Sequence, residues 1–95
     1  KVYETDRVLA FMDVMPRGDG HVLVIPKDHA LESAREITAD NAALIAHIYE
    51  VIARLARELG LDGGYRVVTN AGPDAGQTVM HLHFHLLGGK LGPMA

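Results

Sequence analysis

The chain has 95 residues, which is enough for one domain, and its 48 % hydrophobic and 22 % charged residues exclude a disordered or low-complexity protein. Its net charge of −3 disfavours a protein that binds double-stranded nucleic acid. The sequence contains no run of about 18 apolar residues, so it predicts no membrane span. The absence of cysteine excludes disulfides and cysteine-ligated metals within these residues, and it favours a reducing compartment, so we expect a cytoplasmic protein. We expect the N-terminus to be incomplete, because the sequence begins with Lys1 and not with methionine.

The first predicted elements are two strands joined by a turn. Residues 8–14 form a short apolar run, and residues 16–20 supply the proline and glycines of a turn. Residues 21–25 follow as a second run rich in β-branched side chains, which Pro26 stops. The two runs predict an antiparallel pair, and the nearly continuous apolar character of the second favours a central strand covered on both faces.

A long amphipathic helix is the clearest element of the sequence. We expect a short helical segment over residues 30–36, a helix cap at Thr38, and the main helix over residues 42–59, with Gly60 after its end. Apolar residues recur along the main helix at spacings of three and four, and they are Leu44, Ile48, Val51, Leu55 and Leu59.

The second half of the chain predicts two further strands around a glycine-rich loop. Residues 65–69 alternate as a strand, residues 70–77 form the loop, and residues 78–87 form a final strand ended by two glycines. The order strand, strand, helix, strand, strand predicts a single α+β domain over residues 1–95, with an antiparallel sheet and the main helix on one face. The slightly positive mean hydropathy of +0.09 favours a subunit interface for so small a domain.

Three alternate histidines in the final strand carry the functional signal. Because successive side chains of a strand point to opposite faces, His81, His83 and His85 share one face and the intervening apolar residues face the core. Three hypotheses compete: a solvated strand face, a Zn²⁺ site with an open position, and nucleophilic catalysis by a neutral imidazole.

The glycine-rich loop favours the third hypothesis. Glycines allow backbone N–H groups to turn inward around an anion, and Gln77 and Thr78 offer side-chain donors. Neutral donors beside three histidines suit a phosphate next to a nucleophile. A zinc hydrolase would be expected to place a carboxylate base there, and neither the loop nor the triad contains glutamate.

These motifs resemble those of the histidine triad (HIT) superfamily, and most closely its Hint branch of purine nucleoside phosphoramidases. The triad segment with the glycines after it, the segments 9–13, 21–27 and 64–68, and the loop into Val79 all resemble that branch. The resemblance implies a five-stranded antiparallel sheet with one long and one short helix. It also implies a homodimer, with the long helix and residues 65–69 at the interface.

The resemblance also implies the reaction and the catalytic roles. His83 would attack the α-phosphorus of a purine nucleoside 5′-phosphoramidate and form a covalent nucleotidyl-histidine intermediate, which water then hydrolyses. His85 would donate a proton to the leaving amine, His81 would orient the site, and His21 would be a supporting group.

Binding residues follow from the same resemblance. Asp13 would bind the ribose hydroxyls, Phe11 and Val14 would line the base pocket, and the phosphate would be held by Asn70, Gly76, Gln77, Thr78 and Val79. We expect His29 and His47 to be surface residues.

No cofactor is expected, because the chain lacks the paired cysteines that accompany zinc in many family members. The expected partners are a purine nucleotide such as AMP or GMP and a second copy of the chain, without nucleic acid or membrane. Alternatives are a dinucleoside polyphosphate hydrolase of the same superfamily, a nucleotide-binding or scaffolding module with incidental activity, and a zinc-dependent hydrolase.

Overall fold

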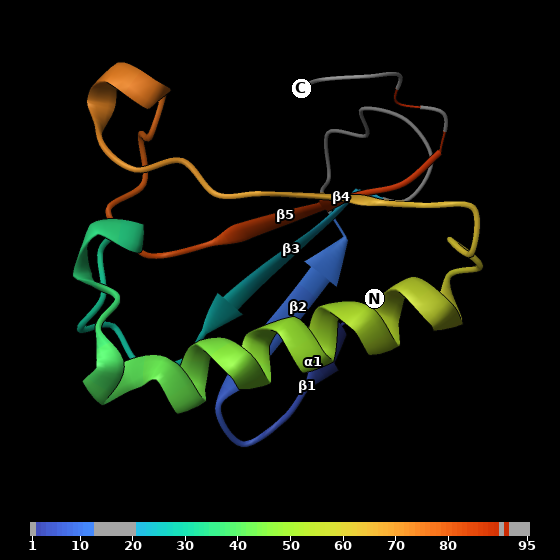
Figure 1. Cartoon of the computed structure of the whole chain (residues 1–95), viewed down its shortest axis with the longest axis horizontal. Coiled ribbons are helices and arrows are strands. Elements are labelled where there is room, and N and C mark those ends of the chain that lie inside the picture. Colours follow the sequence, from blue (N-terminus) through green and yellow to red (C-terminus); the bar gives the residue numbers. More distant parts are fainter. Residues whose placement is uncertain (1, 13–20, 90, 92–95) are drawn as a thin grey trace.

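The protein consists of a five-stranded antiparallel sheet and one long helix, as predicted (Figure 1). A computed structural model describes residues 2–12, 21–89 and 91. The strand order in the sheet is β1-β2-β3-β5-β4, and every neighbouring pair is antiparallel. The strands are β1 (Val2–Glu4), β2 (Val8–Met12), β3 (His21–Pro26), β4 (Arg66–Val68) and β5 (Phe84–Leu87).

The helix α1 (Ala42–Glu58) covers one face of the sheet (Figure 1). Its buried stripe packs on the inward-facing side chains of the strands, and the core joins Leu44, Ile48, Val51, Ile52 and Leu55 to Val8, Ala10, Val22, Val24, Leu82, Phe84 and Leu86. The predicted stripe is confirmed except at Leu59, which is 42 % exposed because the helix has already ended. Gly60 follows with φ of 75°, a conformation that favours glycine at a helix end.

The start of α1 is a 3₁₀ turn, which the sequence did not indicate. The turn η2 (Ala39–Asn41) leads directly into the α-helix, and Thr38 caps it: the Thr38 hydroxyl accepts from the Asp40 N–H at 3.2 Å. The Asn41 side chain accepts from the Thr38 N–H at 2.9 Å and completes a capping box. The short helix expected over residues 30–36 is only η1 (Ala34–Glu36).

Strand β3 lies in the middle of the sheet, but the expectation that both of its faces are covered is wrong. Val22 and Val24 are buried against α1, whereas Leu23 and Ile25 on the opposite face are half-buried and line a pocket. The strand therefore has a core face and a site face.

The last strand is much shorter than the predicted 78–87, because β5 begins at Phe84. Proline has no N–H, so Pro26 cannot donate to the ladder that would extend β5 toward residue 82. The Leu82 N–H instead donates to the Leu31 carbonyl at 2.9 Å, outside the sheet.

The other predicted strands also differ in extent. β4 spans three residues instead of 65–69, and β2 ends at Met12, with residues 13 and 14 outside the described part of the chain. The fifth strand that the resemblance implied is β1, which the sequence pattern did not locate. No helix within the described residues is long and apolar enough to cross a membrane.

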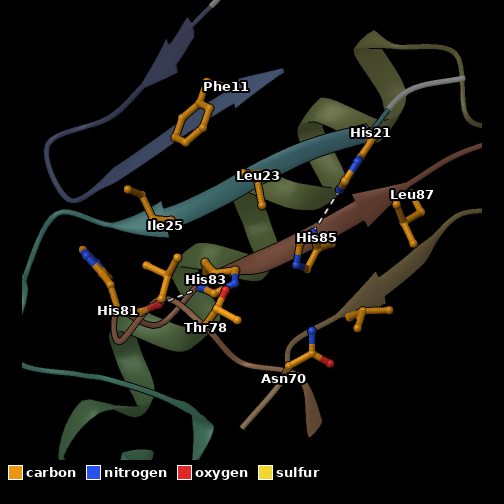
Figure 2. A pocket seen from close by; sticks show the side chains of 13 residues that line it. Phe11, His21, Leu23, Ile25, Asn70, Thr78, His81, His83, His85 and Leu87 are labelled. Carbon is orange, nitrogen blue, oxygen red and sulfur yellow. Dashed lines mark hydrogen bonds between the residues drawn. The ribbon is translucent and has the colours of Figure 1, made fainter. Parts of the chain in front are cut away.

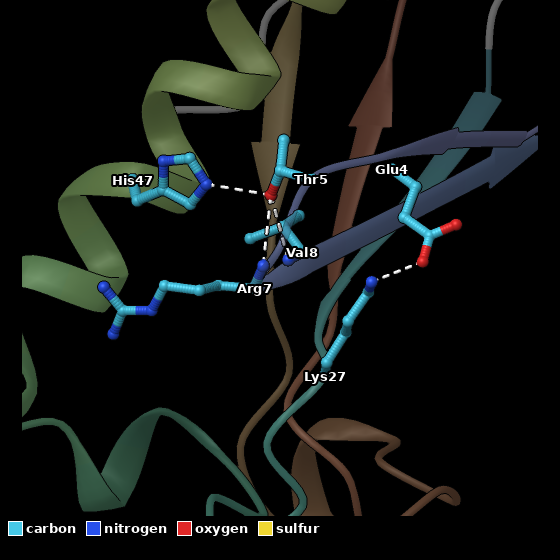
Figure 3. Close-up of polar contacts among 6 residues, drawn as sticks. All are labelled: Glu4, Thr5, Arg7, Val8, Lys27 and His47. Atoms are coloured by element: carbon cyan, nitrogen blue, oxygen red, sulfur yellow. Dashed lines mark hydrogen bonds and ion pairs between the residues drawn. The ribbon is translucent and has the colours of Figure 1, made fainter.

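A hydrogen bond ties α1 to the turn between β1 and β2 (Figure 3). The Thr5 Oγ1 accepts from the N–H groups of Arg7 at 3.3 Å and Val8 at 3.1 Å, so its own hydrogen is available for His47 Nε2, 3.0 Å away. His47 is thus bonded to Thr5 and half-buried, so it lies at the surface as expected but is only partly solvated. On the same edge, Lys27 pairs with Glu4 (Figure 3).

Candidate active site

A pocket of about 680 Å³ lies on the face of the sheet away from α1 (Figure 2). The four histidines His21, His81, His83 and His85 line it together. Its apolar walls come from β2 and β3 on one side and from β4 and the end of β5 on the other, and they are Phe11, Leu23, Ile25, Val68 and Leu87. The loop between β4 and β5 contributes Asn70, Gly76, Thr78 and Val79.

The alternation of the triad persists although only its last histidine lies in a strand. Leu82, Phe84 and Leu86 are buried in the core, and the three histidines are half-buried on the pocket face. The sequence interpretation of the two faces is therefore confirmed, because extended backbone keeps a period of two even before ladder pairing begins.

His83 is held in one tautomer by the backbone of His81, two residues before it (Figure 2). Its Nδ1 lies 2.7 Å from the carbonyl oxygen of His81, and a carbonyl can only accept, so Nδ1 carries the hydrogen. In the neutral ring the lone pair then resides on Nε2. The Thr69 hydroxyl donates to the His83 carbonyl at 2.7 Å, so the residue is also fixed from the side of β4.

His85 is paired with His21 across two strands (Figure 2). The register places His21 opposite Leu87, so His85 is its diagonal neighbour on the same face. His21 Nε2 lies 2.9 Å from His85 Nδ1, and one of these nitrogens must donate to the other. His21 is only 5 % exposed, which makes it the most deeply placed of the four histidines in the pocket.

His81 is anchored to the end of β3. Its Nε2 donates to the Pro26 carbonyl at 2.9 Å. The ring of His29 contacts the ring of His81 edge to face, with centroids 4.6 Å apart. The sequence treated His29 as a surface residue, and it is exposed, but the pattern gave no sign of this contact because it depends on the turn after β3.

The side chain of Gln77, a predicted phosphate donor, does not line the pocket. The residue is only 5 % exposed. Its Oε1 accepts from the Gly72 N–H at 2.8 Å, and its Nε2 donates to the carbonyls of Glu32 and Val79 at 2.6 and 2.9 Å. The side-chain amide is thus fully used in holding the loop.

The backbone of the loop also departs from the expected anion-binding nest. It contains the 3₁₀ turn η3 (Pro73–Ala75), in which the N–H groups of Ala75 and Gln77 donate to the Gly72 carbonyl and that of Gly76 donates to Pro73. These three donors point into the loop. The polar side chains that the loop presents to the pocket are Asn70 and Thr78 (Figure 2).

Most of the predicted site residues therefore meet in one pocket, including Phe11, Asn70, Gly76, Thr78 and Val79 beside the four histidines. Gln77 lies behind the loop, and Asp13 and Val14 lie outside the described residues. Sequence reasoning missed four apolar lining residues, which the period-two patterns of β3, β4 and β5 could have identified: Leu23, Ile25, Val68 and Leu87.

The pocket lining contains no permanently charged side chain: none of its 13 described residues is Asp, Glu, Lys or Arg. Over residues 2–12, 21–89 and 91, no group of three or more His, Asp or Glu side chains is arranged to hold a metal ion. The chemistry of the described site therefore resides in imidazoles, one amide and one hydroxyl.

Sequence and structure comparisons agree on the family. The HIT domain model matches residues 1–92. An uncharacterized HIT-like protein of Synechococcus elongatus is 49 % identical over 89 residues, covering 94 % of this chain and 77 % of that protein. An uncharacterized HIT-like protein of Chlamydia trachomatis is 43 % identical over 91 residues, and the match covers 96 % of this chain and 81 % of that protein.

Solved structures give the same result. A HIT family hydrolase from Clostridium thermocellum superimposes with a TM-score of 0.92 at 44 % identity, covering 99 % of this chain and 84 % of that one. A histidine triad protein from Clostridium difficile gives a TM-score of 0.89 at 46 % identity, covering 99 % and 82 %. The sequence, the fold and the clustered histidines thus lead to one conclusion, that the chain belongs to the HIT domain family.

Proposed function

We propose that the protein is a nucleotide hydrolase that cleaves the P–N bond of purine nucleoside 5′-phosphoramidates through a covalent intermediate on His83. The observation that carries the proposal is the hydrogen bond from His83 Nδ1 to the His81 carbonyl, because it leaves the Nε2 lone pair of a pocket residue available for attack. The hydrolase neighbour from Clostridium thermocellum supports the reaction class.

In the first step, His83 Nε2 attacks the α-phosphorus, an Nε2–P bond forms and the P–N bond to the amine breaks. The departing amine takes a proton from His85. In this role His85 is an imidazolium with a hydrogen on each ring nitrogen: Nδ1–H donates to His21 Nε2, 2.9 Å away, and the Nε2 hydrogen is given to the leaving amine.

In the second step, water attacks the nucleotidyl phosphorus and the bond to His83 Nε2 breaks. His85, which lost its proton in the first step, accepts the proton of the water. The products are the nucleoside monophosphate and the amine, and both imidazoles return to their starting forms.

The walls of the pocket fit the parts of such a substrate. Phe11, Leu23 and Ile25 form an apolar surface for a purine base, and Asn70 and Thr78 offer neutral donors for phosphate oxygens. We propose that Asp13 binds the ribose hydroxyls, as its place in the sequence after Phe11 suggests.

The test is release of AMP from adenosine 5′-phosphoramidate by metal-stripped protein in the presence of a chelator. We expect chelator-resistant release in the wild type and almost none in His83→Ala, because the covalent step has lost its nucleophile. His47→Ala is the matched control: it removes an imidazole from α1, on the other side of the sheet, and is expected to retain activity. Mass spectrometry of protein quenched in alkaline denaturant, which preserves a histidine P–N bond, should detect the nucleotidyl adduct in the wild type alone.

Other outcomes would point to other functions. Full turnover by His83→Ala would refute the mechanism. Release only after zinc is added back would make the histidines a metal site, and faster cleavage of diadenosine polyphosphates would identify a different substrate. Nucleotide binding by folded protein without any turnover would favour a binding module.

A further inference from the structure

The turn after β3 contacts His81 at two points and the backbone of Leu82 at a third. The Pro26 carbonyl accepts from His81 Nε2 at 2.9 Å, and the Leu31 carbonyl accepts from the next backbone N–H, that of Leu82, at 2.9 Å. Between these two anchors, His29 contacts the His81 ring edge to face, with centroids 4.6 Å apart and planes at 68°. The segment from residue 26 to residue 31 therefore contacts both the side chain of His81 and the backbone that follows it.

The sequence builds this turn locally. The Asp28 carboxylate accepts from the Ala30 N–H at 2.9 Å, which closes a turn around His29. His29 itself is exposed and does not line the pocket. Its ring contact with His81 is therefore a packing contact at the rim of the site, and the residue is not placed to touch the substrate.

We propose that His29 is a positioning residue for the nucleophile, acting through His81. The His81 carbonyl accepts the hydrogen of His83 Nδ1 at 2.7 Å, so the position of residue 81 determines which nitrogen of His83 keeps the lone pair. The His29 ring limits the movement of the His81 ring about its side-chain bonds. The kinetic consequence rests on the proposed function, whereas the effect on the His83 tautomer does not.

The magnitude follows from the geometry required for attack. Reacting atoms must be aligned closely, and small displacements of a nucleophile cost up to about 100-fold in rate. His29 acts at one remove from His83, so we expect about a 10-fold slower formation of the nucleotidyl adduct in His29→Ala. Because His29 is exposed, its removal should leave the melting temperature within about 4 °C of the wild type.

Three variants separate positioning from general effects. His29→Ala removes the ring, and His29→Phe retains an aromatic edge without a titratable nitrogen. Lys27→Ala is the matched control, because Lys27 lies in the same turn but points to Glu4 on the outer edge of the sheet (Figure 3). The first measurement is the ring ¹⁵N spectrum of His83, and the second is the single-turnover rate of adduct formation with adenosine 5′-phosphoramidate.

We expect a single Nδ1–H tautomer of His83 in the wild type, His29→Phe and Lys27→Ala, and a mixture of tautomers with slower adduct formation in His29→Ala. The proposal would be overturned if His29→Ala had the wild-type spectrum and the wild-type rate. It would also be overturned if His29→Phe restored neither the single tautomer nor the rate of adduct formation. If the wild type forms no adduct, the proposed function fails, and the tautomer in His29→Ala still decides whether His29 positions His83.

Discussion

Replacing Gln77 tests whether the active-site loop is held by a buried amide. The substitution Gln77→Met keeps the length and much of the shape of the side chain but removes its polar atoms. The variant loses three hydrogen bonds: the one that Gln77 accepts from the Gly72 N–H and the two that it donates to the carbonyls of Glu32 and Val79. Since Gln77 is 5 % exposed, water cannot easily replace them around the new side chain.

The expected loss of stability follows from the number of bonds. A hydrogen bond of this kind contributes about 1 kcal/mol net, so the three together predict a loss of about 3 kcal/mol in the free energy of unfolding. For a domain of this size, 1 kcal/mol shifts the melting temperature by about 4–8 °C, which predicts a fall of roughly 12–24 °C. Urea unfolding followed by circular dichroism measures the first quantity, and thermal unfolding the second.

A matched variant in the next residue makes the result decisive. Thr78 is exposed and lines the pocket, so Thr78→Val should change stability little while weakening nucleotide binding. If Gln77 were a phosphate ligand, Gln77→Met would behave in the same way as Thr78→Val. A Gln77→Met protein within about 0.5 kcal/mol of the wild type would therefore refute the structural role.

Three further predictions concern the core, a close contact and assembly. Leu82→Ala should lower the free energy of unfolding by about 2–5 kcal/mol in urea, because Leu82 is fully buried; a smaller loss would contradict its place in the core. Gly88→Ala should cost about 1–3 kcal/mol in the same assay, since its Cβ would lie 2.4 Å from Leu61 Cδ2. We also propose a homodimer through α1 and the edge strand β4, near the exposed Tyr49 and Tyr65, and sedimentation equilibrium should give twice the chain mass.

The parts of the fold that follow from periodicity were predictable from the sequence. The stripe of α1 and the alternation around the triad both identify which side chains enter the core, because burial of apolar surface dominates each choice. The family motifs added the five-stranded sheet, whose β1 has only three residues and too little pattern to be recognised alone. The early end of the ladder at Pro26 was readable in principle from the missing N–H.

The parts that depend on tertiary contacts were not predictable. Gln77 looks like a ligand in a glycine-rich loop, yet its partners include a carbonyl 45 residues away in the chain. His29 lies in a polar turn and His47 on the polar face of the helix, and only the fold brings one to His81 and the other to Thr5. A polar side chain has no periodicity that reveals its partner, so its role emerges only when distant segments meet.

The absence of lysine and arginine from the described lining of the pocket has a consequence for the response to salt. Among its described residues, phosphate oxygens would meet imidazoles, an amide and a hydroxyl, and no lysine or arginine. Dissolved ions weaken attraction between fixed charges far more than short hydrogen bonds from neutral donors. Nucleotide affinity should therefore change little between low and physiological ionic strength, and a doubly charged monophosphate product would leave without having to break an ion pair with a lysine or arginine of the described lining.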